Sequence, residues 1–573
     1  MKNREIAEIF EKMADILDFK GENPFKINAY RKAARVIGDL HDDIEAIYKQ
    51  GKLKDIPGVG TGIAKKIEEY LTTGKMTKYE EVAKGVPDGL VELLSIQDLG
   101  PKTLAAAYDK LGVNNLDDLK RVIEDGSLAA LPGMGAKKVE NIRRGVKLYL
   151  ASRGRIPLGI AFPLVEGIIS QLEQMEEVIQ ICPAGSLRRM KENIGDIDIL
   201  ATGHNGEQII DRFTHLPQVT EILIAGGTKG SVIVEGGTQV DLRVVDPDSY
   251  GAALQYFTGS KAHNIHLREI AKSRGLKINE YGVFRGEEKI GGKDEKDVYS
   301  ALGLPWIPPE MREDRGEIEA AFSNSLPCLI SEDEVLGDLH VHSKYSDGTA
   351  SIEDIALKAR ELGYQYIAIC DHSQSAKYAG GLSEQELLEQ MEHIKDVNRK
   401  ISGIYVLSGA EVDIKGDGSL DYPDELLSKL DIVIAAIHSG FKKNVTERMV
   451  KAMENPHVDI VAHPTGRLIS AREGYEVDVD RIMRKAAQTN IVLEINAYYD
   501  RLDLSDVNCR KAKELGIRLA IGTDAHHLDQ LWAIKLGVAV ARRGWLERED
   551  VINTLSGEEI LQLSRRPKEY KKY

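Results

Sequence analysis

Hydrophobic and polar positions change their spacing twice along the chain. Residues 1–150 carry apolar residues at helical spacing, beginning with the amphipathic segment MKNREIAEIFEKMADIL (1–17). In the middle, GDIDIL (195–200) and TQVDLRVV (238–245) alternate apolar and polar positions, which predicts half-buried strands. Beyond about residue 335, short apolar runs recur with helical segments between them. The order predicts a helical first region, an α+β middle and an α/β C-terminal domain.

Three similar segments repeat in the helical region: LKDIPGVGTGIAKKI (53–67), LLSIQDLGPKTLAAA (93–107) and LAALPGMGAKKVENI (128–142). Each is predicted to end one helix, turn on glycine and begin another. Glycine lets the backbone come close to a ligand, and the N–H groups at a helix start suit a phosphate oxygen. Ordinary helix turns are the alternative, and the middle copy has Asp98 in place of the first glycine. The glycines that we expect to contact a nucleic-acid backbone are Gly58, Gly60, Gly100, Gly133 and Gly135.

The segment GDIDIL places two acids in an apolar run. On a strand, Ile197 and Ile199 point to one face while Asp196 and Asp198 point to the other, where they repel each other unless a cation lies between them. Asp241, on the polar face of TQVDLRVV, adds a third acid. Three acids on adjacent strands can hold two divalent ions and transfer a phosphoryl group. Exposed strand acids without a metal are the alternative.

Seven apolar runs follow residue 335, and helical segments separate them: LGDLHVH, YIAICDH, IYVLSGAEVDI, DIVIAAIH, VDIVAH, IVLEI and IRLAIGTDAH. Seven β-then-α units predict a closed parallel barrel, whose chemistry lies at the C-terminal edge of its strands. A lone strand-end histidine is more often a hydrogen-bonded core residue, but a whole rim of them predicts a metal site. The ligands that we expect to converge are His340, His342, Asp347, His372, Glu411, His438, His463, Asp524 and His526. Arg467 either contacts phosphate or forms a structural salt bridge.

Composition limits the class of protein. A chain of 573 residues with 42% hydrophobic and 29% charged residues predicts about three or four globular domains. The apolar runs are too short for a membrane span, and the charged N-terminus is unlike a secretory signal, so we expect a cytoplasmic, nucleoid-associated protein. A net charge of -15 argues against nucleic-acid binding. The local motifs outweigh it, because metal-binding carboxylates count as negative although their ions neutralise them.

These motifs resemble the bacterial family X DNA polymerases, relatives of polymerase beta, that carry a C-terminal PHP (polymerase and histidinol phosphatase) domain. The resemblance rests on NPFKINAYRKAARVI (23–37), AGSLRRMKEN (184–193) before GDIDIL, YFTGSKAHNIHLR (256–268), and the DLHVHSKYSDGT, CDH, GAEVDI, AIHS, AHP and TDAHH series. It implies a multidomain fold: an all-α helix-hairpin-helix region, an α+β nucleotidyltransferase palm with a nucleotide-pocket subdomain, and an α/β PHP barrel with seven βα units. The implied bounds are 1–85 and 86–150 for the two helix-hairpin-helix domains, 151–250 for the palm, 251–318 for the nucleotide pocket, 319–335 for a linker and 336–573 for the PHP domain.

The resemblance also implies a 5'-phosphate pocket near the N-terminus. Lys66 aligns with the Schiff-base nucleophile of the members that act as lyases, and Lys26 and Tyr30 match pocket residues. Gly62 replaces a lysine of that pocket, which weakens the expectation of phosphate binding and of lyase activity. A solvated surface charge is the alternative interpretation of Lys66.

For the palm, the resemblance implies that Asp196, Asp198 and Asp241 are catalytic. Gln239 and Lys261 depart from polymerase beta, which has an arginine and an aspartate at these places, so nucleotide affinity and the setting of Asp241 are expected to differ. The implied nucleotide contacts are Arg155, Gly185, Ser186, Arg189, Gly195, Tyr256, Phe257, Gly259, Asn264 and Arg268.

We therefore expect a monomeric DNA repair polymerase that uses dNTPs to fill short gaps. Its PHP domain is expected to act as a metal-dependent 3'-5' exonuclease or AP endonuclease on gapped or nicked DNA. The expected cofactors are Mg²⁺ or Mn²⁺ in the palm and up to three Mn²⁺, Zn²⁺ or Fe ions in the barrel. Two rivals are a phosphoesterase for small phosphates with a relic front half, and a non-enzymatic DNA-end scaffold.

Overall fold

Helices alone form the described part of the first of two units, which meet in sequence at residues 153 and 154. The helices of this unit are α1 (Lys2–Phe19), α2 (Pro24–Gly38), α3 (Ile44–Lys49), α4 (Thr61–Thr73), α5 (Thr77–Ala83), α6 (Asp88–Leu93), α7 (Pro101–Leu111), α8 (Leu116–Glu124) and α9 (Ala136–Ser152). One core lies between residues 6 and 82, where Phe10 of α1 stacks on Tyr30 of α2 with ring centroids 5.8 Å apart. A second core lies between residues 90 and 146. The two cores confirm the all-α prediction for this region.

The computed structural model describes residues 2–38, 44–56, 59–94, 96, 99–152, 155–469 and 474–565. Gly58, a predicted DNA contact, lies outside these residues, as does Asp98. Among the helices within these ranges, none combines the length and the apolar character that a membrane crossing requires.

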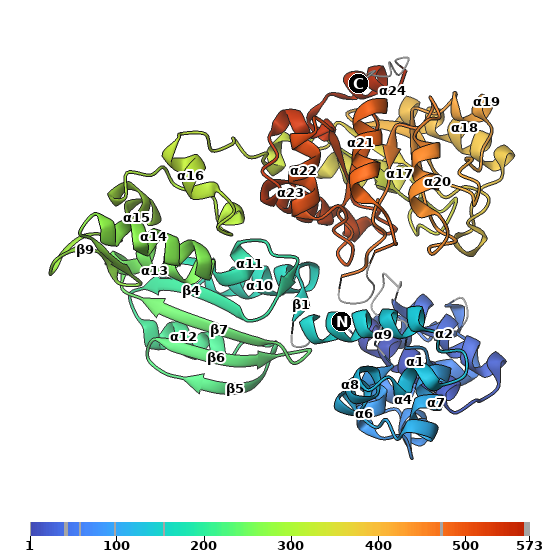
Figure 1. The fold of residues 1–573 in the computed structure, drawn as a ribbon, viewed down its shortest axis with the longest axis horizontal. Helices are drawn as coiled ribbons and strands as arrows, with labels where there is room; N and C mark the ends of the chain where they lie inside the picture. Colours follow the sequence, from blue (N-terminus) through green and yellow to red (C-terminus); the bar gives the residue numbers. More distant parts are fainter. Residues whose placement is uncertain are drawn as a thin grey trace. The chain divides into compact units, whose positions relative to one another are not determined.

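The palm is an α+β layer. Its elements are β1 (Ile156–Pro157), α10 (Leu158–Leu172), β2 (Val178–Pro183), α11 (Gly185–Arg188), β3 (Asn193–Ile194), β4 (Ile197–Gly203), α12 (Gly206–Thr214), β5 (Val219–Ala225), β6 (Lys229–Val234), β7 (Gln239–Val245) and α13 (Tyr250–Thr258). Five strands form a sheet in the order β2–β4–β7–β6–β5, in which only the β4–β7 pair is parallel. Apolar side chains of α10 and α12 pack on one face of this sheet and those of α13 on the other (Figure 1).

The segment expected to be the nucleotide-pocket subdomain follows α13. Its elements are α14 (Lys261–Ser273), β8 (Lys277–Asn279), β9 (Gly282–Arg285), β10 (Glu288–Gly291), α15 (Glu295–Ala301), η4 (Pro309–Met311) and α16 (Glu317–Phe322). A buried ion-pair network joins it to the palm, because Glu295 pairs with Arg188 at 2.7 Å and with Arg312 at 2.6 Å. Trp306 donates a further hydrogen bond to Glu295 at 2.8 Å. Buried charges are tolerated only when they are paired in this way.

The C-terminal domain is a parallel barrel of seven βα units. Its strands are β11 (Gly337–Val341), β12 (Tyr366–Ile369), β13 (Tyr405–Asp413), β14 (Ile432–Ala436), β15 (Ile460–Val461), β16 (Val492–Asn496) and β17 (Leu519–Gly522). Its helices are α17 (Ile352–Glu361), α18 (Glu384–Lys400), α19 (Asp424–Leu427), α20 (Val445–Ala452), α21 (Val479–Thr489), α22 (Asp506–Glu514), α23 (Ile534–Arg543) and α24 (Gly557–Arg565). The strands pair in chain order. A bridge between Val341 and Ala525 brings the first and last of them nearly to closure.

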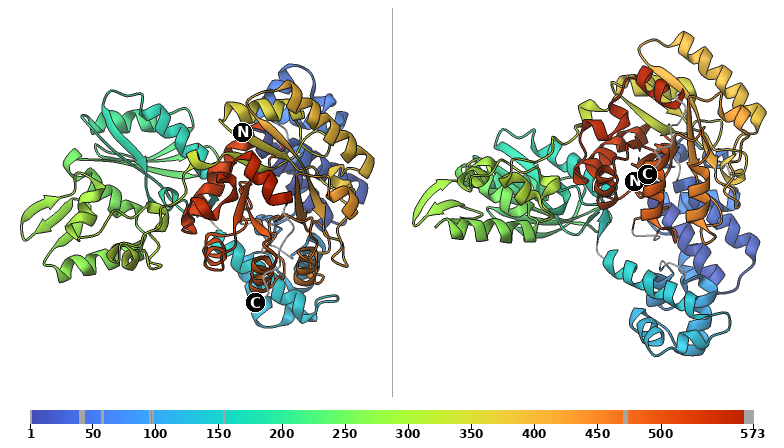
Figure 2. Two further views of the ribbon diagram at one scale, coloured as in Figure 1. Left: turned by 90° about the horizontal axis from the view of Figure 1, so that it is seen from above. Right: turned by 45° about the horizontal axis from the view of Figure 1, so that its top comes forward.

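Each barrel strand faces two cores. Leu339, Tyr366 and Ile434 belong to a cluster that fills the inside of the barrel. Val341 and Ile367 belong to the cluster between the strands and the surrounding helices. Figure 2 shows these helices around the strands. Because both faces are buried, the strands are continuous apolar runs rather than alternating ones.

The palm and the barrel are joined without a gap. The cluster that covers the outside of the barrel continues into the palm and includes Val165 and Leu242. At Gly159 of α10, a Cβ atom would lie 2.4 Å from the Cβ atom of Tyr499, so no side chain fits there. The close approach requires glycine for its lack of a Cβ atom.

We predict that Glu295→Ala lowers the free energy of unfolding by about 3–5 kcal/mol, because it leaves the buried guanidinium groups of Arg188 and Arg312 without their carboxylate. Urea unfolding followed by circular dichroism measures the loss. Asp248→Ala is the control, because Asp248 forms only an exposed 3.8 Å pair with Lys293, and we expect no measurable change. Equal stability of the two variants would contradict the structural role of the network.

Candidate functional site

The three predicted catalytic aspartates lie at the ends of neighbouring palm strands. Asp198 in β4 is the direct parallel partner of Asp241 in β7. Asp196 lies directly before β4, so the strand predicted over residues 195–200 begins two residues later than expected and contains only the second of the two acids. The strand starts only at Ile197, where pairing with β7 begins. Asp196 is exposed, whereas Asp198 is half-buried.

The surroundings of Asp198 and Asp241 differ. Burial raises the pKa of Asp198, and the nearby charges of Asp241 and Asp196 raise it further. Burial also raises the pKa of Asp241, but hydrogen bonds outweigh it and hold that pKa below its usual range. These bonds come from Gln239 at 2.9 Å and from Ser231 at 2.5 Å.

Lys229 is a neighbour of Asp241 that the sequence did not reveal. Its Nζ lies 3.1 Å from Asp241 Oδ2. It comes from β6, which pairs with β7. The ammonium group therefore supplies a positive charge to Asp241, whereas at Asp198 burial and the charges of Asp241 and Asp196 outweigh the opposing effect of Arg243 and Lys229.

The Gly-Ser turn approaches these acids. Gly185 has a φ of +60°, and a Cβ atom there would lie 3.1 Å from Asp198 Oδ2. Glycine is therefore required both for its backbone angle and for the close approach. Ser186 follows in α11, and Gly195 comes directly before Asp196 with open space on its Cβ side. The structure thus places Gly185 beside Asp198 in space and Gly195 beside Asp196 along the chain.

The expected sugar wall lies at the end of α13. Tyr256 and Phe257 meet edge to face with ring centroids 5.2 Å apart, and Gly259 follows with a φ of +70°. Asn264 is engaged within the protein, because it accepts from Gln255 at 2.7 Å and donates to the Tyr256 carbonyl at 2.8 Å. It therefore braces α14 against α13.

The predicted arginines differ in their settings. Arg155 and Arg268 are exposed, and Arg268 lies one turn after Asn264 on α14. Arg189 is instead tied within the protein, since its Nε pairs with Glu313 at 3.0 Å and its Nη1 donates to the Thr258 carbonyl at 2.5 Å. Contact of Arg189 with a triphosphate would compete with these bonds.

The described hairpin glycines precede helices as expected. Gly60, Gly100 and Gly135 lie directly before α4, α7 and α9, and no atom lies within 4 Å of the position where a Cβ atom would stand on each. Gly133 has a φ of +76°, a conformation that favours glycine. The exposed backbone at these three helix starts is suited to a phosphate group.

The N-terminal pocket brings Lys66 over Tyr30. The Lys66 Nζ lies 5.7 Å from the centre of the Tyr30 ring and donates to the Gly62 carbonyl at 2.8 Å. Burial lowers the pKa of Lys66, and the charges of Lys78 and Lys26 lower it further against the opposing effect of nearby glutamates. Lys78 of α5 is a second cation of this pocket that sequence reasoning missed.

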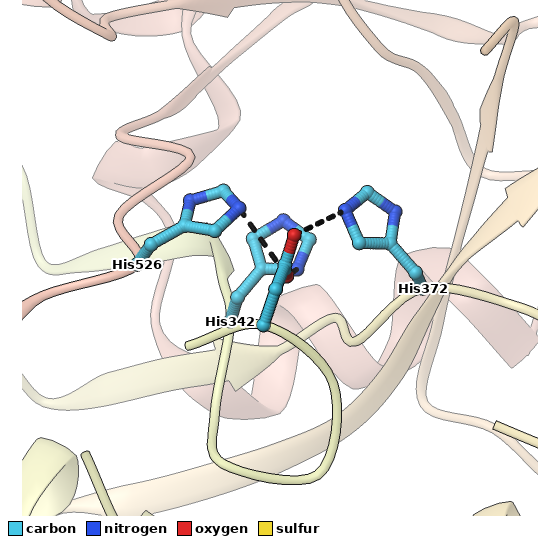
Figure 3. Close-up of side chains that lie close together, drawn as sticks. His342, His372 and His526 are labelled. Carbon is cyan, nitrogen blue, oxygen red and sulfur yellow. Dashed lines mark ion pairs between the residues drawn. The ribbon is translucent and has the colours of Figure 1, made fainter. Parts of the chain in front are cut away.

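The nine predicted metal ligands of the barrel converge at the C-terminal edge of its strands. Among the described residues, the groups of three or more potential ligands with donor atoms within 4.8 Å of one another all lie here. The palm aspartates form no such group. Figure 3 shows His342, His372 and His526 facing one another, and dashed lines mark the ion pairs of the latter two with Asp347. We name the set the rim cluster: His340, His342, Asp347, His372, Glu411, His438, His463, Asp524 and His526.

Glu411 lies at the centre of the rim cluster. It is 1% exposed, and its oxygens lie 2.8 Å from His372 Nδ1, 3.1 Å from His438 Nε2 and 2.9 Å from His463 Nε2. Burial raises the pKa of Glu411, but the neighbouring histidines outweigh it and hold the pKa well below its usual range. A buried carboxylate with this many imidazole neighbours is a typical setting for a transition-metal ion.

The donor atoms fit metal ions. The Nδ1 atoms of His342 and His463 are buried without a hydrogen-bond partner in the described structure. The Nε2 atoms of His340 and His342 face each other at 3.2 Å. Burial, together with the charges of His526 and His372, lowers the pKa of His342 to about 3, so this ring is neutral and can coordinate a metal.

Comparisons with known proteins agree with this architecture. Family models match residues 1–76 (helix-hairpin-helix domain), 90–147 (SAM-like helix-hairpin-helix tandem), 253–313 (DNA polymerase beta thumb) and 338–498 (PHP domain). A Bacillus subtilis protein named DNA polymerase/3'-5' exonuclease PolX is 41% identical over 569 residues, which cover 98% of this chain and 99% of the relative. The chain belongs to the family X DNA polymerases that carry a PHP domain.

Two other relatives each match part of this family X chain. Arabidopsis thaliana DNA polymerase lambda is 28% identical over 356 residues, which cover 54% of this chain and 62% of the relative. A probable phosphatase of Thermoanaerobacter pseudethanolicus is 30% identical over 233 residues, which cover 38% of this chain and 89% of the relative. The identities confirm the predicted family and the multidomain fold.

Residues behind the rim of the PHP barrel orient its histidines. Glu494 accepts from His340 Nδ1 at 2.6 Å and from the His463 backbone N–H at 2.7 Å. Asp413 lies 3.1 Å from His438 Nδ1. Sequence reasoning missed both carboxylates, although each interrupts an apolar strand, which is the one signal that could have revealed them.

Arg467 has a structural role within the family X chain. It pairs with Glu192 of the palm at 2.7 Å and donates to the carbonyls of Arg501 and Leu502. The alternative of a structural salt bridge therefore describes its position, and its guanidinium is engaged away from the rim cluster.

We predict that Glu494→Gln weakens metal binding to the PHP barrel by about 10–100-fold, because a carboxylate behind a ligating histidine fixes the ring and raises its basicity. Competition with a chelator measures the affinity for Mn²⁺. Glu353→Gln is the matched control, since Glu353 pairs at 2.9 Å with His393, which is outside the rim cluster. Unchanged affinity in Glu494→Gln would contradict the orienting role.

We also predict that metal binding releases protons at pH 7. Burial lowers the pKa values of His438 and His526, but neighbouring carboxylates outweigh it and raise them to about 10 and about 9. Both rings are therefore protonated without metal and must become neutral to bind it. The affinity for the metal ion consequently rises about tenfold per pH unit for each proton released, up to about pH 9. Titration calorimetry of Mn²⁺ in buffers with different ionisation enthalpies counts the protons, and a count of zero would refute this charge state.

Proposed function

We propose that this family X polymerase fills short gaps in DNA at the palm and trims 3' ends at the PHP barrel. The proposal rests on one observation. The chain carries two separate sets of potential metal ligands, the palm aspartates and the rim cluster, together with helices that begin after a glycine and suit a DNA backbone. The substrates are gapped or nicked DNA and dNTPs. We further propose that the protein acts as a monomer in DNA repair, in the cytoplasm near the nucleoid.

At the palm, Asp196, Asp198 and Asp241 would hold Mg²⁺ or Mn²⁺. When bound, two such ions supply activation of the primer hydroxyl and neutralisation of the triphosphate charge. Lys229 would leave Asp241 Oδ2 as the site fills, while Ser231 and Gln239 keep Oδ1 in place. The charges of Asp241 and Asp196 help to raise the pKa of Asp198, so these three carboxylates repel one another until a cation lies between them.

Nucleotide binding would use the residues around the Gly-Ser turn. Gly185 and Ser186 offer backbone and hydroxyl groups beside Asp198, and Tyr256 with Phe257 offers an aromatic wall for the sugar. The further contacts proposed for the nucleotide are Arg155, Arg189, Gly195, Gly259, Asn264 and Arg268.

At the barrel, the rim cluster would hold up to three Mn²⁺, Zn²⁺ or Fe ions. Bound ions of this kind supply a water nucleophile at neutral pH and stabilise charge on a phosphodiester. Glu411 lies between the histidines that would bind neighbouring ions, and Glu494 and Asp413 hold His340 and His438 in orientation. The opening lies at Asp347 and His526, whose side chains are 33% and 25% exposed. A 3' end or an abasic site would enter there.

The N-terminal domain would bind a 5' phosphate and could add a lyase step. The lowered pKa of Lys66 increases the share of neutral amine, which is the form that attacks an aldehyde to give an imine. Lys26, Lys78 and Tyr30 surround it with groups that suit a phosphate. Gly62 in place of a lysine weakens the phosphate grip.

We predict that Asp241→Ala abolishes nucleotide incorporation but leaves 3'-end hydrolysis unchanged, because the two acid clusters share no residue. Primer extension and degradation on one gapped substrate with Mn²⁺ measure both reactions. Glu235→Ala, an exposed change just before β7, should extend primers normally. Near-normal incorporation by Asp241→Ala would overturn the palm assignment.

The reciprocal change is His340→Ala, which we predict to delete hydrolysis of DNA ends while polymerisation continues. His457→Ala is its control, because His457 comes before β15 and so lies at the end of the barrel opposite the rim cluster. If the metal-loaded protein hydrolyses small phosphate esters but no single-stranded, nicked or abasic DNA, the barrel is a small-molecule phosphatase.

For the lyase step, we predict that borohydride traps a covalent adduct with a 5'-deoxyribose phosphate. Reduction of the imine at Lys66 fixes the sugar to the protein. Lys66→Ala should lose the adduct, and Lys65→Ala, a change on the neighbouring exposed residue, should retain it. An adduct that survives Lys66→Ala would remove Lys66 from the site.

A further inference from the structure

A row of four alternating charges links the PHP barrel to the palm. Asp506 of α22 pairs with Arg543 of α23 at 2.7 Å, Arg543 pairs with Glu313 at 3.1 Å, and Glu313 pairs with Arg189 at 3.0 Å. We name these four residues the ion network. It begins on the outer helices of the barrel and ends on an arginine that flanks the Gly-Ser turn of the palm.

The ion network is shielded from water. The side chains of Asp506, Arg543, Glu313 and Arg189 are 16%, 4%, 12% and 12% exposed. Charges in such positions are weakly screened by salt, so a change at one of them is felt by its neighbours. Burial raises the pKa of Glu313, but Arg189, Arg543 and Lys191 outweigh it and hold the pKa below its usual range. Glu313 is therefore a carboxylate shared by two arginines.

Arg543 also touches the palm backbone directly. Its Nη1 donates to the Arg189 carbonyl at 2.6 Å, so it fixes the chain as well as the charge beside the Gly-Ser turn. Arg189 in turn donates to the Thr258 carbonyl, next to Gly259 of the expected nucleotide pocket. A residue of the barrel thus reaches the polymerase pocket through two contacts.

The sharing of Glu313 controls how much positive charge Arg189 can offer. Glu313 attracts the guanidinium of Arg189 and opposes its movement toward a triphosphate, while Arg543 neutralises part of Glu313. If Arg543 were removed, Glu313 would hold Arg189 more tightly, and the potential at Arg189 would become less positive. If Glu313 were neutralised, the opposite would follow.

We propose that Arg543 of the PHP barrel is a positioning residue for the polymerase reaction, which sets the affinity for the incoming nucleotide through Glu313 and Arg189. The proposal rests on the proposed function, in which Arg189 contacts the triphosphate. It gives the barrel a second role, in which its outer helix adjusts the charge of the nucleotide pocket.

The experiment is gap filling by the full-length protein at varied dNTP concentration. We expect Arg543→Ala to raise the KM for dNTP about fivefold or more with kcat changed much less, and Glu313→Gln to lower the KM. Arg543→Lys, which keeps the charge, should restore most of the affinity. The two neutralising changes break the same network, so a purely structural role would move their KM values in the same direction.

Arg542→Ala is the matched control. Arg542 is the neighbour of Arg543 on α23 and also joins the barrel to the nucleotide-pocket subdomain, through Glu310 at 2.8 Å and the Ile330 carbonyl at 2.8 Å. In the described structure its ion pair and hydrogen bonds go to Glu310 and Ile330, and not to Glu313 or Arg189. We expect its KM to stay near that of the parent protein. Thermal unfolding and 3'-end hydrolysis, measured on every variant, report whether the fold and the rim cluster are intact.

The outcomes separate this inference from the proposed function. If Arg189→Ala raises the KM while Arg543→Ala does not, the coupling is wrong and the nucleotide contact stands. If Arg189→Ala leaves the KM unchanged, the nucleotide contact is wrong and the coupling falls with it. Equal shifts in Arg542→Ala and Arg543→Ala, or shifts of the same sign in Arg543→Ala and Glu313→Gln, would also overturn the coupling.

Discussion

The burial of Glu411 is the constraint on which the rim of the barrel depends. A carboxylate at 1% exposure is costly unless polar or charged partners surround it, and here His372, His438 and His463 lie within about 3 Å of its oxygens. Each histidine comes from the end of a different strand, so the barrel must hold its register for the charges to meet. A metal ion satisfies the same demand better than protons, because it can be shared among several of these groups.

The cost of burying a carboxylate is compensated differently in each region. In the palm, Asp241 gains a lysine and two neutral donors, whereas Asp198 keeps a raised pKa because burial and its neighbouring carboxylates outweigh Arg243 and Lys229. In the nucleotide-pocket subdomain, Glu295 is surrounded by two arginines and needs no ion. The difference distinguishes structural charge from functional charge: a carboxylate that the protein has fully paired is closed to a ligand, and one left with like charges is open to a cation.

The sequence predicted those features that depend only on where a residue lies within one helix or strand. The rim ligands could be predicted because strand ends share one edge of a parallel barrel, and the hairpin glycines because each precedes a helix. Lys229 could not be predicted, since its contact with Asp241 depends on how β6 pairs with β7. The placement of Asp196 before the strand depends likewise on where strand pairing begins, which alternation of residues does not define.

Gly159 has a consequence for how variation in this protein should be interpreted. Since the palm helix α10 meets Tyr499 of the barrel with no room for a methyl group, and one apolar cluster runs through both regions, a change that disrupts this contact disturbs the packing of both catalytic regions. A missense change at this joint would silence synthesis and trimming together without touching either set of acids. Simultaneous loss of both reactions in a naturally occurring variant is therefore a signature of a damaged joint rather than of shared chemistry.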